Sequence, residues 1–426
     1  MARIIFTNAR LVDGDNPPRD GATIVIVGER IESIEFSRPV ESRPGDEVHD
    51  LGGRSVMPGL INGHYHATYT RLGEGGHVTA PGMEAPPALQ ALRASRHLKM
   101  ALHAGFTGVV SGGAPYAIDA SCKQAIADGV IEGPRIIAGS RDVSTTGHAQ
   151  DWWQWHWGPG MTAQTNIVDG PDAFRKAIRE EVKRGSEIIK IFATAGHAIK
   201  GTPGLEVTED ELKAAADAAT QRNARIRAHI VGKEPILAAL RAGVHVIDHG
   251  DGIDSECIDR LCETQAPFIP SMLYPHRVVQ VISGPRRDEM KADIDQMLEV
   301  LPAANKAGVV LTLGDDFGAV PLDHGAYADE LEYYVHEAGI PPLDVIRWGT
   351  KNGAKLMRME HDLGTLEVGK LADLIVVDGC PVADVRLLKA DRGGILAVMK
   401  GGVFATSRLD ELKRTGAKAG KANINA

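Results

Sequence analysis

Short apolar runs alternate with amphipathic segments from Phe106 to Asp316. The runs are FTGVVSGG, RIIAGS, EIIKIFAT, RIRAHIV, HVIDHG, PFIPSML and VVLTLGDD, and the earlier stretch VMPGLINGHYHATY brings their number to eight. Between them lie amphipathic segments such as Pro171 to Gly185 and Thr208 to Asn223, and the second opens with a capping-box pattern. Eight strands alternating with helices predict an α/β chain folded as a (β/α)8 TIM barrel. A doubly wound open sheet would alternate in the same way, but no Gly-rich phosphate-binding fingerprint follows the first strand.

The two ends of the chain show a different pattern. Residues 3–50 and 364–406 contain strand-like stretches separated by Gly and Asp turn residues. Neither end has enough strand to bury a core alone, so we expect residues 1–57 and 360–412 to form one small, discontinuous β-sandwich domain. Residues 58–359 would form the barrel domain. Residues 413–426, where large apolar side chains are nearly absent, would be a frayed tail.

Composition narrows the class of protein. The 426 residues carry a formal net charge of -9 and no basic run that could neutralise a phosphate backbone, which argues against nucleic acid as a partner. No stretch approaches the roughly 18 apolar residues of a membrane span, and no signal peptide is recognisable, so we expect a cytoplasmic protein. The four cysteines form no CxxC pair, so a bound metal would need His, Asp, Glu or Lys chemistry.

Polar residues stand at or near the ends of five predicted strands, and a barrel builds its active site at the carboxyl ends of its strands. They are His64 and His66 on the first, Lys190 on the fourth, His229 on the fifth, His249 on the sixth and Asp316 on the eighth. Taken singly, His229 could be a core histidine, His249 a capping residue, and Lys190 a lysine that snorkels or pairs with a carboxylate. Taken together, they favour a metal site. His64 and His66 lie two apart in an extended chain and therefore share one face.

The chain resembles the amidohydrolase superfamily, in the branch of imidazolonepropionase-like, prolidase-like and ochratoxinase-like enzymes. The motifs that carry the resemblance are MPGLINGHYH, IIKIFATAG, RAHIVG, IDHGDGID and LGDDFG, followed by GTLEVGKLADLIVVD and VMKGGV near the carboxyl end. They extend over essentially the whole chain.

The resemblance implies two divalent metal ions, with Zn²⁺ expected. His64, His66 and Asp316 would bind one ion, His229 and His249 the other, and a carboxylated Lys190 would bridge them. Carbon dioxide would convert the amine of Lys190 into an anionic carbamate, which removes the cost of an unpaired ammonium in an apolar strand. Deaminases of the superfamily usually place a glutamate soon after the fifth-strand histidine, and the sequence HIVGKEP does not match that pattern well.

The implied mechanism uses a hydroxide that bridges the two ions as the nucleophile, since metal binding lowers the pKa of water to about 7. Asp316 would take the proton from the attacking water and pass it to the leaving amine. Asp315 is the competing candidate for both roles. The Gly-x-Asp pattern of the family favours Asp316.

Substrate contacts are expected from two loops. In DVSTTGHAQDWWQWHWGPG, His148 is the candidate for the substrate carbonyl or carboxylate, and the tryptophans beginning with Trp152 and Trp153 either form an aromatic wall or pack the loop on the barrel rim. Tyr274 and His276 follow the seventh strand and are further candidates.

The sequence therefore predicts a hydrolase of carbon–nitrogen bonds that cleaves an amide, with an N-acyl amino acid or dipeptide-like molecule as substrate and a homo-oligomer as the assembly. A mononuclear deaminase or cyclic-amide hydrolase on the same barrel is the first alternative. A non-catalytic assembly protein of this fold is the other, and the complete ligand set argues against it.

Overall fold

A computed structural model describes residues 3–36, 40–72, 84–148, 150–151, 163–196 and 204–410. The chain divides into two compact units. The first comprises Met1–Leu60, Ala101–Thr107 and Pro342–Ala426, and the second comprises Ile61–Met100 and Gly108–Pro341. The domain boundaries expected from the sequence stay a prediction. Among the described residues, no helix combines the length and the apolar character that crossing a membrane requires.

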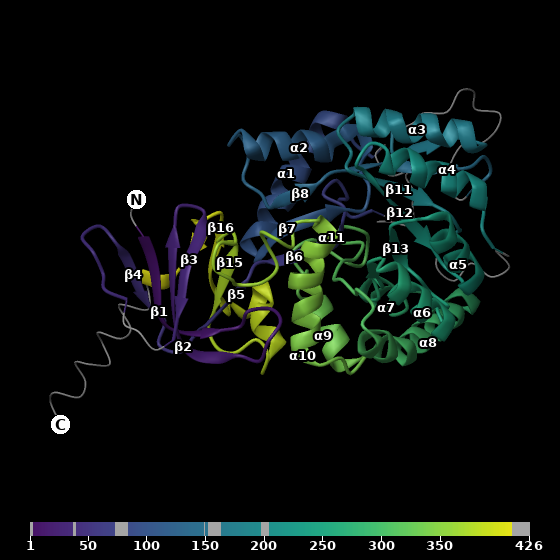
Figure 1. The fold of residues 1–426 in the computed structure, drawn as a ribbon. Coiled ribbons are helices and arrows are strands. Elements are labelled where there is room, and N and C mark those ends of the chain that lie inside the picture. Colours follow the sequence, from purple (N-terminus) through teal and green to yellow (C-terminus); the bar gives the residue numbers. More distant parts are fainter. Residues whose placement is uncertain are drawn as a thin grey trace. The chain divides into compact units, whose positions relative to one another are not determined.

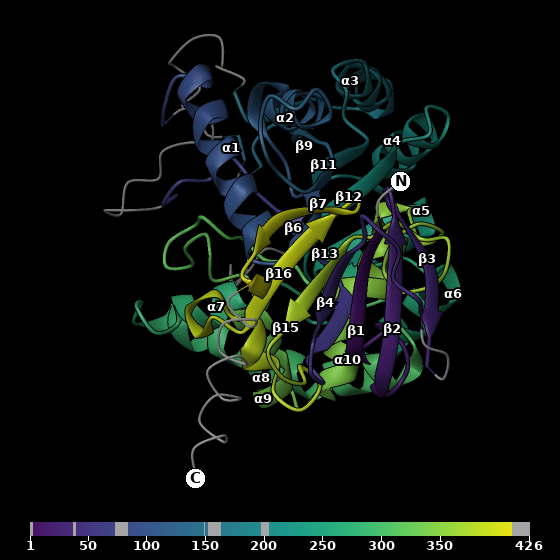
Figure 2. The same cartoon turned by 90° about the vertical axis from the view of Figure 1, so that its left-hand side faces the viewer.

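The first unit is built on one eight-stranded sheet to which both ends of the chain contribute (Figure 1). The amino-terminal strands are β1 (Arg3–Leu11), β2 (Arg19–Val27), β3 (Arg30–Glu35), β4 (Glu47–Asp50) and β5 (Ser55–Pro58), and the carboxyl-terminal ones are β15 (Leu374–Val377), β16 (Ile395–Lys400) and β17 (Val403–Ser407). Their order is β17-β16-β15-β5-β1-β2-β3, with β4 paired to β1. The two ends meet where β5 pairs antiparallel with β15, and Figure 2 shows yellow β15 and β16 in one sheet with purple β1 and β2.

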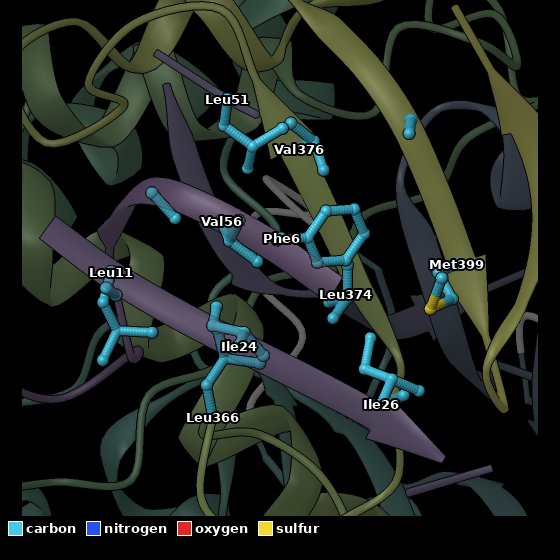
Figure 3. Packing of buried hydrophobic residues seen from close by; sticks show 14 of the residues in the cluster. Phe6, Leu11, Ile24, Ile26, Leu51, Val56, Leu366, Leu374, Val376 and Met399 are labelled. Carbon is cyan, nitrogen blue, oxygen red and sulfur yellow. The ribbon is translucent and has the colours of Figure 1, made fainter. Parts of the chain in front are cut away.

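The core of this unit follows from strand alternation. Ile24 and Ile26 of β2 lie two apart, as do Leu374 and Val376 of β15, so each pair projects to one face of the sheet. These side chains and Phe6 belong to one buried apolar cluster (Figure 3). Helices α10 (Pro342–Arg347) and α11 (Gly353–Met357) also fall within this unit.

The second unit contains two sheets of three and six strands, and parallel pairing is recorded in both. The smaller has the order β6-β7-β8 and the larger the order β10-β9-β11-β12-β13-β14. The strands are β6 (Leu60–Tyr65), β7 (Phe106–Ser111), β8 (Arg135–Ile137), β9 (Gly139–Ser144), β10 (Thr165–Ile167), β11 (Ile188–Phe192), β12 (Arg225–Ile230), β13 (Val246–His249) and β14 (Phe268–Ile269). The predicted α/β class with parallel strands is confirmed. The third predicted strand is split at Ala138 into β8 and β9.

Helices lie between most of these strands along the chain or follow the last of them. They are α1 (Pro87–His103), α2 (Ile118–Ala127), α3 (Pro171–Lys183), α4 (Glu209–Thr220), α5 (Lys233–Ala242), α6 (Ser255–Thr264), α7 (Leu273–Val278), α8 (Pro285–Ala307) and α9 (Asp329–His336). Helices α3, α4, α5 and α6 pack each against the next, outside β11, β12 and β13 (Figure 1). Thr208 and Glu211 form the expected capping box at the start of α4.

The eighth predicted strand, residues 309–316, makes only a short parallel bridge, between Leu311 and Phe268 of β14. On that side the amide of Thr312 donates to the carbonyl oxygen of Phe268 at 3.0 Å. On the other side the amide of Gly63 in β6 donates to the carbonyl oxygen of Leu313 at 2.6 Å. The segment therefore brings Asp315 and Asp316 close to the end of β6.

Candidate metal centre

His64, His66 and Asp316 converge at the end of β6. Nε2 of His64 lies 3.1 Å from Nε2 of His66 and 3.1 Å from Oδ1 of Asp316, and Nε2 of His66 lies 3.3 Å from the same oxygen. In a tetrahedral zinc site with bonds of about 2.0–2.1 Å, neighbouring ligand atoms are about 3.3 Å apart. The three donor atoms therefore have the spacing that one face of such a site needs.

The ring of His66 has the hydrogen-bonding pattern of a metal ligand. Its Nδ1 lies 3.1 Å from the carbonyl oxygen of Gly113, which can only accept, so Nδ1 carries the proton and Nε2 offers a lone pair. Burial lowers the pKa of His66 to about 4, which keeps the ring neutral at physiological pH.

A glycine makes room for the two histidines. A Cβ atom at Gly112, just after β7, would lie 2.5 Å from Nε2 of His66 and 2.7 Å from Cδ2 of His64. Both distances are well below van der Waals contact, so any larger residue at this position would displace at least one ring.

His249 and His229 extend the cluster. His249 has a left-handed backbone with φ of 68°, a conformation that non-glycine residues rarely adopt. Simple alternation would send His249 and the preceding Asp248 to opposite faces, yet both reach His64: Nδ1 of His64 is 3.4 Å from Asp248, and the His64 and His249 ring centroids are 5.2 Å apart. The His229 and His249 centroids are 4.4 Å apart. His64, His249 and Asp316 offer ligand atoms that all lie within 4.8 Å of one another.

Lys190 belongs to an ion-pair network that reaches His64 through Asp248. Its Nζ is 2.8 Å from Oδ2 of Asp248, and Arg227 of β12 contacts both oxygens of the same carboxylate at 2.9 and 2.6 Å. All three side chains are almost completely buried. Burial alone would raise the pKa of Asp248, but Arg227, Lys190 and His64 outweigh it and hold that pKa well below its ordinary value.

The two neighbouring aspartates differ in what they contact. Asp316 faces His64 and His66, and these rings outweigh burial and hold its pKa well below the ordinary range. Asp315 accepts hydrogen bonds from the amides of Leu273 and Tyr274 at 2.8 and 3.1 Å and from the amide of Asp316 at 2.8 Å. Burial, with repulsion from Asp316, raises the pKa of Asp315 to about 7. The geometry favours Asp316 as the ligand and gives Asp315 backbone contacts.

The first candidate substrate residue, His148, is hydrogen-bonded to other parts of the protein. Nδ1 of His148 accepts from the amide of Gln150 at 2.9 Å, and Nε2 lies 3.0 Å from the carbonyl oxygen of Thr194 and 3.2 Å from Glu206. Both ring nitrogens therefore have protein partners that a substrate would have to displace.

Tyr274 is the second residue of α7, and its amide donates to Asp315. His276, on the same helix, has its ring centroid 4.8 Å from that of Tyr333. Trp152 and Trp153 lie outside the described residues.

Two charged residues of the site were missed by the sequence analysis, namely Arg227 and Asp248. Each stands inside a run already recognised as a strand, Arg227 two positions before His229 and Asp248 one position before His249. A charge within an apolar strand is the signal that could have found them, and Arg227 also shares the face of His229 by alternation.

A family model described as "Amidohydrolase family" matches residues 55–405. The chain belongs to this family. Ochratoxinase from Aspergillus niger is 26% identical over 425 residues, covering 92% of this chain and 84% of that enzyme. These similarities confirm the predicted superfamily, in its ochratoxinase- and prolidase-like branch, and the prediction of a hydrolase acting on amide bonds.

Solved structures agree with this assignment. A Xaa-Pro dipeptidase with methionine bound in its active site superposes with a TM-score of 0.82 at 28% identity, covering 95% of this chain and 99% of that one. A prolidase in complex with N-methylphosphonate-L-proline gives a TM-score of 0.83 at 27% identity, covering 96% of this chain and 100% of that one.

Proposed function

We propose that this amidohydrolase is a binuclear, metal-dependent enzyme that hydrolyses an amide bond of an N-acyl amino acid or dipeptide-like substrate with a bulky or aromatic group. The observation that carries the proposal is the convergence of His64, His66 and Asp316 at 3.1–3.3 Å, with His249 beside them. Three such donors at strand ends match the spacing of ligand atoms around zinc.

Two divalent ions, for which we propose Zn²⁺, would be held at this cluster. The residues are His64, His66 and Asp316 for one ion, His229 and His249 for the other, and Lys190 as a bridging carbamate. Bound zinc supplies Lewis acidity and lowers the pKa of a water molecule to about 7. The neutral amine of Lys190 would add to carbon dioxide, forming a nitrogen–carbon bond and releasing one proton. Asp248, which pairs with the ammonium of Lys190 in this structure, would then still have Arg227 as its cationic partner.

Asp316 is proposed to move the proton. Its carboxylate can accept a proton from the attacking water and donate it to the amine that leaves. Asp315 already accepts hydrogen bonds from three backbone amides, which supports Asp316 in this role.

The proposed substrate class draws on the relatives. A prolidase bound to a proline phosphonate, a Xaa-Pro dipeptidase and ochratoxinase are named among them. His148, Tyr274 and the segment containing Trp152 and Trp153 are the proposed substrate contacts. A homo-oligomer in the cytoplasm stays a prediction.

We also propose that the two parallel sheets close into the expected barrel. The segment 309–313 supports closure, because it hydrogen-bonds to Phe268 of the six-stranded sheet and to Gly63 of the three-stranded sheet.

Elemental analysis, combined with a screen of N-acyl amino acids, dipeptides and cyclic amides, tests the proposal. Protein purified with zinc available should contain close to two ions per chain and should hydrolyse a member of the first two groups. A content near one ion with full activity would contradict the binuclear site.

One observation favours a mononuclear deaminase or cyclic-amide hydrolase as a second candidate. The ion pair of Lys190 with Asp248 gives the buried ammonium a partner without carboxylation. Lys190→Ala separates the two readings. In a binuclear site the variant should lose metal and activity together, and short carboxylic acids, unlike neutral amides of the same size, should partly restore both. In a mononuclear site it should keep its metal and most of its turnover.

A further inference from the structure

Arg227 is completely buried, and each of its five N–H groups has an acceptor. Nε and Nη2 donate to Oδ2 and Oδ1 of Asp248 at 2.9 and 2.6 Å. Nη1 donates to the carbonyl oxygens of Gly63 at 3.0 Å and Ser111 at 2.6 Å, and Nη2 also donates to Nδ1 of His64 at 3.0 Å. A guanidinium has five donors in a rigid, planar fork, so these contacts fix the side chain in one position.

We propose that Arg227, together with Asp248, is the positioning residue that keeps Nε2 of His64 directed at the metal in both tautomers of the ring. The inference rests on the proposed function, because it concerns one of the proposed ligands.

The two tautomers of His64 each find a partner. A guanidinium has no acceptor, so Nδ1 of His64 must accept the hydrogen bond from Arg227, and the proton of the neutral ring then lies on Nε2. A metal held at Nε2 would leave the ring proton on Nδ1, to which Nη2 of Arg227 could then no longer donate. The acceptor would be Oδ1 of Asp248, 3.4 Å from Nδ1, in a carboxylate that Arg227 holds through both of its oxygens. The ring therefore keeps its orientation before and after metal binding.

Charge compensation alone does not explain Arg227. Before Lys190 is carboxylated, its Nζ lies 2.8 Å from Asp248, so in that state the negative charge of Asp248 does not depend on Arg227 only. What Arg227 alone provides is the hydrogen bond to His64 and the two hydrogen bonds to backbone carbonyls, one within β6 and one at the end of β7. These contacts link the first-strand ligand to β12 and β13.

Arg227→Lys tests the inference, since lysine keeps the positive charge but lacks the fork. The probe is zinc, titrated against a chromophoric chelator with metal-depleted protein. At least one ion should bind about 10–100-fold more weakly than to the wild type, as expected when a group that orients a metal ligand is lost. At saturating zinc the KM should stay near the wild-type value.

Arg141→Lys is the matched control. Arg141 is also buried, and its guanidinium contacts Glu181 at 2.6 Å, away from the histidines. It should cost stability as Arg227→Lys does, yet leave zinc affinity unchanged. Equal zinc affinity in both variants and the wild type would overturn the role of Arg227.

Histidine-selective ¹⁵N spectra of the wild type keep the inference testable if Arg227→Lys does not fold. Signals missing from His64→Gln identify His64. The proton should lie on Nε2 in metal-depleted protein and on Nδ1 in zinc-loaded protein. A proton on Nδ1 in both states would overturn the inference. Wild-type protein that binds no zinc would overturn the proposed function as well, whereas normal binding by Arg227→Lys would overturn this inference alone.

Discussion

Both units bury many apolar side chains, but the second also contains a cluster of charged side chains in direct contact that are almost completely buried. In the first unit, Phe6, Ile24 and Val376 belong to a buried cluster made only of apolar side chains. In the second, Lys190, Arg227 and Asp248 are equally buried but charged, and they contact one another directly. Both units are built on β-sheets, so the difference does not come from the type of secondary structure. It reflects the roles of the buried side chains, which we infer to be stability in the first unit and metal binding in the second.

Apolar burial stabilises without direction, by about 25 cal/mol for each Å² removed from water. Burying a charge has a large desolvation cost, which ion pairing offsets only in part. The paired charges do, however, hold their side chains in a defined geometry. We therefore expect the apolar core to determine stability and the charged interior to determine metal binding and rate. Four substitutions test this division.

Asp316→Asn should have the largest effect. The amide has the shape of the carboxylate but cannot take up a proton or offer an anionic ligand, so kcat should fall roughly 10⁴-fold. The urea midpoint of the metal-depleted protein should stay close to that of the wild type. A variant that is insoluble or unfolded would show that this residue serves the fold, and the proposed division would be wrong.

Phe6→Ala is the opposite case. Removing a fully buried ring from the apolar cluster should cost about 3–5 kcal/mol in the free energy of unfolding. At temperatures where the variant is folded, kcat and zinc content should match the wild type. Chemical denaturation followed by activity assays provides the check, and a loss of rate without a loss of stability would contradict the comparison.

Asp119 in α2 is a buried carboxylate of the second unit, and burial raises its pKa to about 6. Between about pH 4 and 6 the folded chain holds this proton and the unfolded chain has released it, so stability should fall as the pH rises through this window. The contribution is on the order of 2–3 kcal/mol. Asp119→Asn should remove that part of the pH dependence. Unfolding curves at pH 4.5, 5.5 and 6.5 would reveal it, and an unchanged slope would exclude Asp119 as its source.

Gly112→Ala should have the smallest effect. The added Cβ would meet Nε2 of His66 at 2.5 Å, so the ring must shift, and zinc affinity should fall about tenfold. The comparison variant is Gly129→Ala, because no heavy atom lies within 4 Å of a Cβ at that glycine. Its positive φ strains the backbone, so it should lose some stability but keep its zinc affinity. Identical zinc titrations for both variants would show that His66 has room to move.

Local patterns were sufficient for much of this protein. Alternation within one strand placed His64 and His66 on one face, and the switch between strand and helix periodicity predicted the α/β class. The capping box of α4 was likewise predicted from the four consecutive positions 208–211. These features depend on neighbours in the chain, which a sequence shows directly.

Contacts between distant segments were decided only by the tertiary structure. The choice between Asp315 and Asp316 depends on which carboxylate meets the amides of α7 and which meets β6, and the two are chemically identical in the sequence. Arg227 gained its role because strand register pairs it with Val246, two positions before Asp248, and packing brings it within reach of His64, more than 160 positions away in the chain. The left-handed backbone of His249 overrides the alternation of β13. Hydrophobic periodicity specifies which face of a strand is buried, but the partner of a buried charge is specified by register and packing, which form only when the whole unit is assembled.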